Sequence, residues 1–147
     1  MTDWPRQPDS RTCGPSVLVV AEDLSGPWPD FEERVLAMHR RVNRFWPRAL
    51  GTTPWAVARE LDGRVRRFRR DEVIAALAHG PVPVYLGTRW LPRHVVLALE
   101  MQNDGLRVYD PARGAVVLIG SSRWKVPWWS VVPTRGPWPS ARRTPPG

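Results

Sequence analysis

The sequence predicts one α+β domain in which helices come first and an antiparallel sheet follows. Apolar residues recur at helical spacing as far as about residue 79, and from Gly80 onward short runs rich in Val, Leu and Ile are separated by turn residues. The length of 147 residues fits a single domain that buries one core. We therefore expect a set of helices segregated to one side of a sheet.

Four helices are predicted. The first begins at or just after Cys13 and continues to Asp23, and its apolar run over 17–21 indicates burial on nearly all sides. The second follows Asp30, which has the character of an N-cap with Glu33 three residues later, as in a capping box. The second, third and fourth helices are expected over about 31–42, from the pair Thr53-Pro54 to Leu61, and over 71–79, respectively.

Six short strands are predicted, one before the last helix and five after it. The turn Asn103-Asp104-Gly105 is a strong hairpin signal between two of them. Residues 1–132 are expected to form the folded domain, and the Pro- and Arg-rich segment 133–147 is expected to be disordered. The strands are expected over 64–68, 82–86, 94–101, 106–109, 115–119 and 128–132.

The composition excludes several classes of protein. The single cysteine, Cys13, allows neither an intramolecular disulfide nor a zinc site built from several thiolates. No apolar run approaches the ~18 residues of a membrane span. The segment Met1 to Arg6 does not begin a standard secretory signal, so a cytoplasmic location is expected by default, with export by a dedicated secretion system as the alternative. The net charge of +8 can attract polyanions without specificity, but no nucleic-acid-binding motif is present.

Cys13 is the first candidate for chemistry. A lone cysteine is often just a small buried apolar residue. Here it precedes Gly14-Pro15 and an apolar helix, and the positive end of a helix dipole favours a thiolate over a thiol. Gln7, six residues upstream, could add a side-chain N–H to the Cys13 backbone N–H and stabilise an oxyanion, although a glutamine in an extended segment is more often a solvated surface residue.

A thiolate nucleophile also needs a base, and the chain has three histidines. His39 lies in an arginine-rich helical stretch where a solvated face is expected, and His79 stands at a helix C-terminus, where an imidazolium gains from the dipole. His94 opens an apolar strand and is the best candidate for the base. Asp110 ends the next strand, at the same edge of the sheet, and could orient His94. A count from the hairpin turn leaves Asp110 short of facing His94, so neighbourhood alone is predicted, and Asp-Pro can also be a plain turn.

Three motifs occur in order along the chain: Gln-x5-Cys-Gly-Pro before an apolar helix, His-Val-Val-Leu-Ala-Leu, and Tyr-Asp-Pro-Ala-Arg-Gly. Together they resemble the papain-like cysteine peptidases of the bacteriocin-processing (double-glycine leader) type and their stand-alone relatives, from Gln7 to about Trp129. The resemblance implies a papain-like fold and a hydrolase of peptide or amide bonds that takes a peptide or protein as substrate and uses no metal or cofactor. The implied roles are nucleophile for Cys13, general base and acid for His94, orienter for Asp110 and oxyanion donor for Gln7.

Other functions fit the same residues. An acyl transferase or deamidase, such as a toxin that modifies a glutamine, would use the same constellation, and an inactive relative could bind a peptide or an anionic polymer. The densest basic stretch, 64–70, could contact phosphates, but it is also typical of an edge strand whose arginines deter aggregation. Trp90, just before His94, could cover the site.

Overall fold

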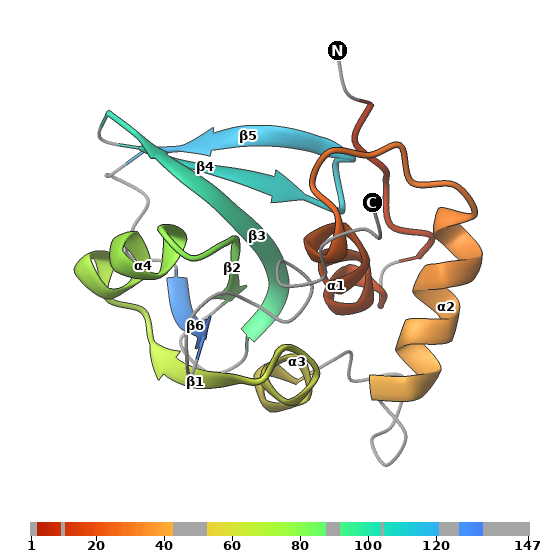
Figure 1. Cartoon of the computed structure of the whole chain (residues 1–147), viewed down its shortest axis with the longest axis horizontal. Coiled ribbons are helices and arrows are strands. Elements are labelled where there is room, and N and C mark those ends of the chain that lie inside the picture. Colours follow the sequence, from red (N-terminus) through yellow and green to blue (C-terminus); the bar gives the residue numbers. More distant parts are fainter. Residues whose placement is uncertain are drawn as a thin grey trace, which may run out of the picture.

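The computed structural model describes residues 3–9, 11–42, 53–87, 92–103, 105–120 and 127–133, which form four helices and one six-stranded sheet (Figure 1). The helices are α1 (Cys13–Glu22), α2 (Phe31–Val42), α3 (Pro54–Leu61) and α4 (Arg70–Leu77). The strands are β1 (Gly63–Arg67), β2 (Val82–Gly87), β3 (Pro92–Gln102), β4 (Gly105–Asp110), β5 (Ala115–Ile119) and β6 (Pro127–Pro133). Every helix and strand predicted from the sequence is present, with small differences at the ends. The expected disordered segment lies outside the described residues from residue 134 on, and so does Trp90.

Neighbouring strands of the sheet are antiparallel throughout, in the order β1-β6-β2-β3-β4-β5. β6 comes last in the chain but lies between β1 and β2, so β1 and β2 run parallel to each other on either side of it. α4 connects these two parallel strands, and such a connection has to cross one face of the sheet. The α+β class predicted from the sequence is confirmed.

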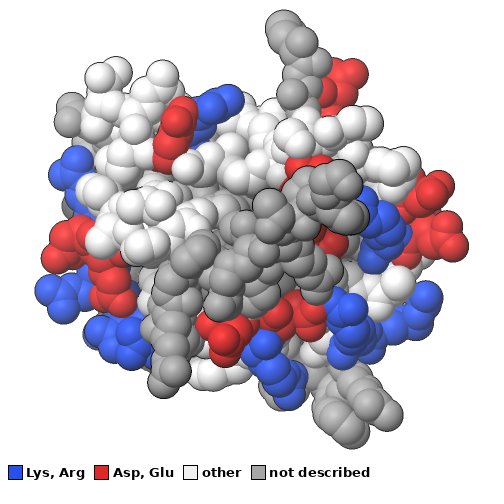
Figure 2. All heavy atoms as spheres, viewed as in Figure 1, with Lys and Arg blue, Asp and Glu red and all other residues white. Residues whose placement is uncertain are grey.

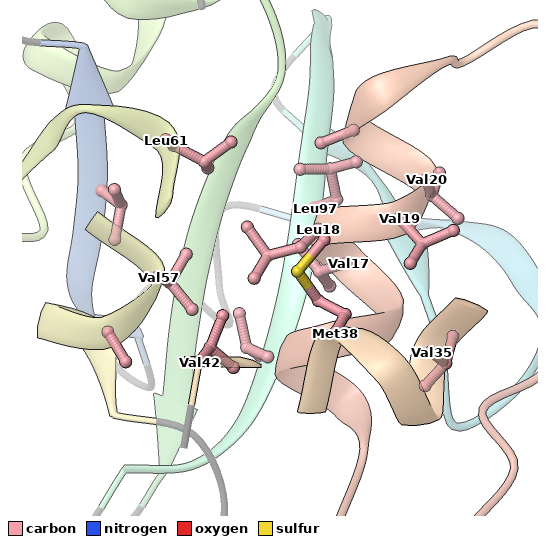
Figure 3. Close-up of a cluster of buried hydrophobic side chains, with 14 of the residues drawn as sticks. Val17, Leu18, Val19, Val20, Val35, Met38, Val42, Val57, Leu61 and Leu97 are labelled. Atoms are coloured by element: carbon pink, nitrogen blue, oxygen red, sulfur yellow. The ribbon is translucent and has the colours of Figure 1, made fainter. Parts of the chain in front are cut away.

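Both faces of the sheet are covered, by different helices. On one face α1, α2 and α3 contribute to a core in which Met38, Val57 and Leu97 lie close together (Figure 3). On the other face Val73 and Ala76 of α4 pack on strand residues that alternate with those of the first core. The expectation that the helices are segregated to one side holds for the first three and is wrong for α4. α4 lies on the other face because it connects the parallel strands β1 and β2. The sequence pattern does not reveal that these two strands are parallel.

Local signals account for the helix starts. Residues 14–21 of α1 are all buried, as the apolar run predicted. Thr53 caps α3, since its side chain accepts a hydrogen bond from the Ala56 N–H at 3.1 Å. Asp30 precedes α2 as expected, but with a φ of 55° instead of the extended backbone of an N-cap, a conformation that aspartate tolerates better than most residues. None of the described helices is long and apolar enough to cross a membrane.

The arginine-rich stretch 64–70 overlaps β1, which is an edge strand as predicted. Arg66 forms an ion pair with Glu72 of α4, with Nε 3.0 Å from Oε1. On the face of the molecule shown in Figure 2, positive and negative side chains lie interspersed. These observations favour the edge-strand interpretation, in which exposed charge deters pairing with another sheet.

Candidate active site

Cys13 is the first residue of α1, so its thiol lies at the positive end of a ten-residue helix. The preceding residue, Thr12, is fully buried, and its carbonyl accepts the Ser16 N–H at 2.9 Å, which fixes the first turn. Gly14 and Pro15 are buried behind the cysteine, whereas Cys13 itself is partly exposed. The structure therefore places a free, partly exposed cysteine at the start of a helix.

His94 and Asp110 meet at one end of the sheet. His94 lies near the start of β3 and Asp110 is the last residue of β4, and the His94 Nε2 atom lies 2.8 Å from Asp110 Oδ1. The His94 side chain is 28% exposed and the Asp110 side chain 13%, so the pair is largely shielded from water. The neighbourhood predicted from the sequence is thus a direct hydrogen bond.

An irregularity in β3 produces this contact. Leu99 is an extra residue in the pairing of β3 with β4, where the register shifts. Continued from the turn without that shift, the pairing would set Asp110 opposite Leu97, with His94 on the other face of the sheet. With the shift, Tyr109 pairs with Leu97, and the same pairing continued by one residue sets Asp110 opposite Val96. His94, two residues before Val96, is then the diagonal neighbour of Asp110 on the same face of the sheet.

Cys13 is the second partner of His94. Burial lowers the pKa of His94, but a side-chain hydrogen bond to Cys13, the charge of the Cys13 thiolate, and then Asp110 outweigh burial and raise the pKa above its ordinary value of 6.5. Because Nε2 is bonded to Asp110, Nδ1 is the ring nitrogen left for the thiol. The structure therefore brings three of the four predicted site residues together in a chain from Cys13 through His94 to Asp110.

The turn after β4 holds the Asp110 carboxylate in place. Besides His94, Oδ1 accepts the Ala112 N–H at 2.9 Å, and Oδ2 lies 3.6 Å from Arg113 Nε. The Asp110 carbonyl accepts the Gly114 N–H at 2.9 Å. Asp110 therefore both forms the turn and contacts the histidine, so the two interpretations of Asp-Pro are compatible.

Gln7 lies near this turn, and its side chain is bonded to Asp9. The Gln7 backbone N–H donates to the Pro111 carbonyl at 2.8 Å, one residue beyond Asp110. Its Nε2 donates to the carbonyl of Asp9 at 2.6 Å, and its Oε1 is buried and has no hydrogen-bond partner among the described residues. Asp9 in turn is bonded through its backbone to Thr12, next to Cys13. The structure thus connects Gln7 with the start of α1 through Asp9, and shows no direct bond to Cys13 within the described ranges.

One histidine lies in a different environment from the one expected, and one buried tyrosine was not anticipated. His39 is only 3% exposed and belongs to the buried face of α2, so the expected solvated position is wrong; α2 packs that face against α1. Tyr85 of β2 was not singled out in the sequence, yet burial first and then the charge of Cys13 raise its pKa well above the ordinary value. A tyrosine within an apolar strand carries no sequence signal for such a position. His79 lies just beyond the end of α4, close to the helix C-terminus expected for it, and it is exposed.

The described part of the chain offers no metal centre, because no three His, Cys, Asp or Glu side chains gather closely enough to hold an ion. The chemistry available there is that of a thiol, an imidazole and a carboxylate in sequence.

Comparison with known proteins supports the fold. No protein-family model matches the sequence, and no curated protein matches it. Among solved structures, the chain is similar to the crystal structure of the peptidase domain of Streptococcus ComA, a bifunctional ABC transporter involved in a quorum-sensing pathway. The TM-score is 0.62 at 20% sequence identity, over 90% of this chain and 99% of that one. The chain therefore has the α+β fold of a papain-like peptidase domain, as the resemblance in its motifs predicted.

Proposed function

We propose that this protein is a thiol hydrolase that cleaves a peptide or amide bond. The observation that carries the proposal is the position of His94, which is hydrogen-bonded to Asp110 at the end of β4 and lies close enough to Cys13 at the start of α1 for the cysteine to raise its pKa. A nucleophile, a base within reach of it and a third group that orients the base are the parts that covalent catalysis by a thiol requires. The similarity in fold to a peptidase domain supports a peptide as the substrate.

In the proposed reaction, His94 takes the proton of Cys13 and the sulfur attacks the carbonyl carbon of the scissile bond. The tetrahedral intermediate collapses, the carbon–nitrogen bond breaks, and His94 returns the proton to the leaving amine. Water, deprotonated by His94, then attacks the thioester, and the carboxylic acid leaves as the thiol is restored. Asp110 keeps its negative charge throughout and stabilises the imidazolium.

The raised pKa of His94 supports this role. A histidine that keeps its proton beside a thiolate is ready both to stabilise the nucleophile and to protonate the amine. Burial alone would have the opposite effect, since it disfavours the charged ring. Cys13 and Asp110 therefore raise the pKa of His94, so the ring keeps the proton that the leaving amine needs.

The oxyanion site in this proposal has two donors. The first N–H groups of α1 have no acceptor within the helix, and that of Cys13 is one of them. The Gln7 Nε2 carries two hydrogens, and the carbonyl of Asp9 accepts one of them. We assign the second hydrogen to the oxyanion, with the bond to Asp9 fixing the amide group in its orientation.

The proposal is tested by incubating the protein with a diverse peptide library and identifying the products by mass spectrometry, with Cys13→Ala as the matched control. New peptide termini that appear only with the unsubstituted protein support hydrolysis. Intact peptides that carry a small mass change at glutamine would replace hydrolysis with deamidation. Binding without any product, lost steeply as salt rises, would instead indicate an inactive module for anionic partners.

A further inference from the structure

Residues 3–9, which we call the N-terminal strap, lie beside the turn that carries Asp110. In Figure 1 this first described segment passes the ends of β4 and β5 before the chain enters α1. Its hydrogen bonds to this turn involve the residues directly before and after Asp110, and neither bond is part of the strand pairing.

The strap holds the residues directly before and after Asp110. The Tyr109 hydroxyl donates to the Pro5 carbonyl at 2.6 Å, and the Trp4 ring stacks on the Tyr109 ring with centroids 5.4 Å apart. On the other side, the Gln7 N–H donates to the Pro111 carbonyl at 2.8 Å. Tyr109 is fully buried, so its hydroxyl would be costly to leave without this acceptor.

A glycine allows the strap to lie this close. Gly114 closes the turn with a φ of 61°, a conformation that side chains rarely adopt. A Cβ atom at Gly114 would lie 2.9 Å from Arg6 Cβ and 3.2 Å from the Arg6 backbone N. Contacts this short with backbone atoms cannot be relieved by rotating a side chain, so any substitution would push the strap away from the turn.

The other end of the strap leads to the nucleophile. The Thr12 hydroxyl donates to the Asp9 carbonyl at 3.1 Å and accepts from the Asp9 N–H at 3.3 Å. Cys13 follows at once as the first residue of α1. The strap therefore connects the helix that bears the thiol with the turn that bears the carboxylate, two parts of the site that are far apart in the sequence.

We propose that the N-terminal strap positions the catalytic groups, with Trp4 and the close contact at Gly114 holding the Asp110 turn against His94. This inference rests on the proposed function for its catalytic meaning, while its geometry concerns only the strap and the turn. The Trp4 ring also contacts the Trp28 ring, with the two centroids 5.2 Å apart. This contact connects the strap with the loop before α2. Loosening the strap frees the turn, weakens the hydrogen bond between Asp110 and His94, and leaves the sheet and helices intact.

Two pairs of variants test the inference. Gly114→Ala forces the strap off the turn, and its control Gly120→Ala adds the same methyl group where no atom lies within 4 Å. Trp4→Ala removes the stacking on Tyr109, and its control Trp55→Ala truncates a tryptophan that is 62% exposed on α3. Each protein is first compared by its melting temperature, and Trp4→Ala decides the question if Gly114→Ala does not fold.

The readouts are the pKa of His94, measured by NMR titration, and the rate at which iodoacetamide alkylates Cys13. In the two strap variants we expect the pKa of His94 to fall below its wild-type value, because one of the groups that raise it has moved, and alkylation to slow about tenfold. Both controls should match the wild type. A folded Trp4→Ala protein with an unchanged pKa of His94 and unchanged alkylation would overturn the inference. Neither readout requires turnover, so failure to cleave any peptide would count against the proposed function and not against the strap.

Discussion

His94 Nε2 lies 2.8 Å from Asp110 Oδ1 although the two residues are sixteen positions apart in the sequence, and the extra residue in β3 is what brings them to one face of the sheet. The carboxylate is held by its own turn at the same time, through the Ala112 N–H. A histidine oriented in this way has one ring nitrogen left for the thiol of Cys13. The hydrogen bond between Asp110 and His94 gives Asp110 the role of orienting the histidine, and substitution of Asp110 can test that role.

Asp110→Asn should retain clearly more activity than Asp110→Ala. An asparagine side chain can still accept a hydrogen bond from the ring and from the turn, whereas alanine can do neither, and we expect the alanine variant to lose on the order of a hundredfold or more in kcat. The measurement is steady-state kinetics on a peptide that the wild type cleaves. Asp71→Ala, which removes an 81% exposed carboxylate on α4, is the control and should be fully active. Equal activity of all these proteins would reduce Asp110 to a turn residue.

Cys13→Ala and His94→Ala should each abolish nearly all turnover, by about 10⁴-fold or more, with the fold retained. Because the thiol and the imidazole act as one unit, the double variant should be no worse than either single one. The comparison needs kcat/KM for the three proteins together with their melting temperatures. Losses that simply add would show that the two residues act separately.

Gln7→Ala should lower kcat by about a hundred- to thousandfold with little change in KM, because an oxyanion donor acts mainly in the transition state. Gln102→Ala provides a matched control, since that glutamine is exposed at the end of β3. A rise in KM with unchanged kcat would move Gln7 to substrate binding. A fall in melting temperature with unchanged kinetics would mean that Gln7 only supports the strap.

The pKa of His94 should be above 6.5 in the wild type and lower in Cys13→Ala, where burial is opposed by Asp110 alone. The folded protein then holds a proton that the unfolded chain releases between pH 6.5 and the raised value. The contribution of His94 to stability is therefore complete below that window and is lost as pH rises through it. NMR titration gives the pKa, and the free energy of unfolding measured against pH gives the slope. The slope in this window should be smaller in His94→Ala than in the wild type and unchanged in His79→Ala; an identical slope in all three proteins would contradict the account.

The sequence was sufficient for the helices and strands because their signals are local. The Thr53-Pro54 pair, the buried run of α1 and the hairpin turn each act within a few residues. The position of α4 could not be predicted in this way, since it depends on the insertion of β6 between β1 and β2, a pairing between distant segments. The burial of His39 likewise depends on how α2 packs, and its neighbouring arginines gave the opposite indication.

The candidate site shows the same division. The order of Cys13, His94 and Asp110 along the chain and their places on a helix and two neighbouring strands could be predicted, and the structure brings them together. The extra residue in β3 could not be predicted, because no glycine or proline marks its position. A one-residue shift of this kind reverses the face of every side chain beyond it. The bond of Gln7 to Asp9 also had no signal, since it depends on the folded path of the strap.

The central claim is that His94 activates Cys13 as a nucleophile, and the most direct measurement is the rate constant for alkylation of Cys13 by iodoacetamide at pH 7, followed by intact-protein mass. The account predicts that the native protein reacts at least about tenfold faster than the protein unfolded in guanidinium chloride, although unfolding exposes the thiol completely. His94→Ala should lose this advantage, and His79→Ala should keep it. A native protein that reacts no faster than the unfolded one, or a His94→Ala variant that reacts as fast as the wild type, would contradict the claim.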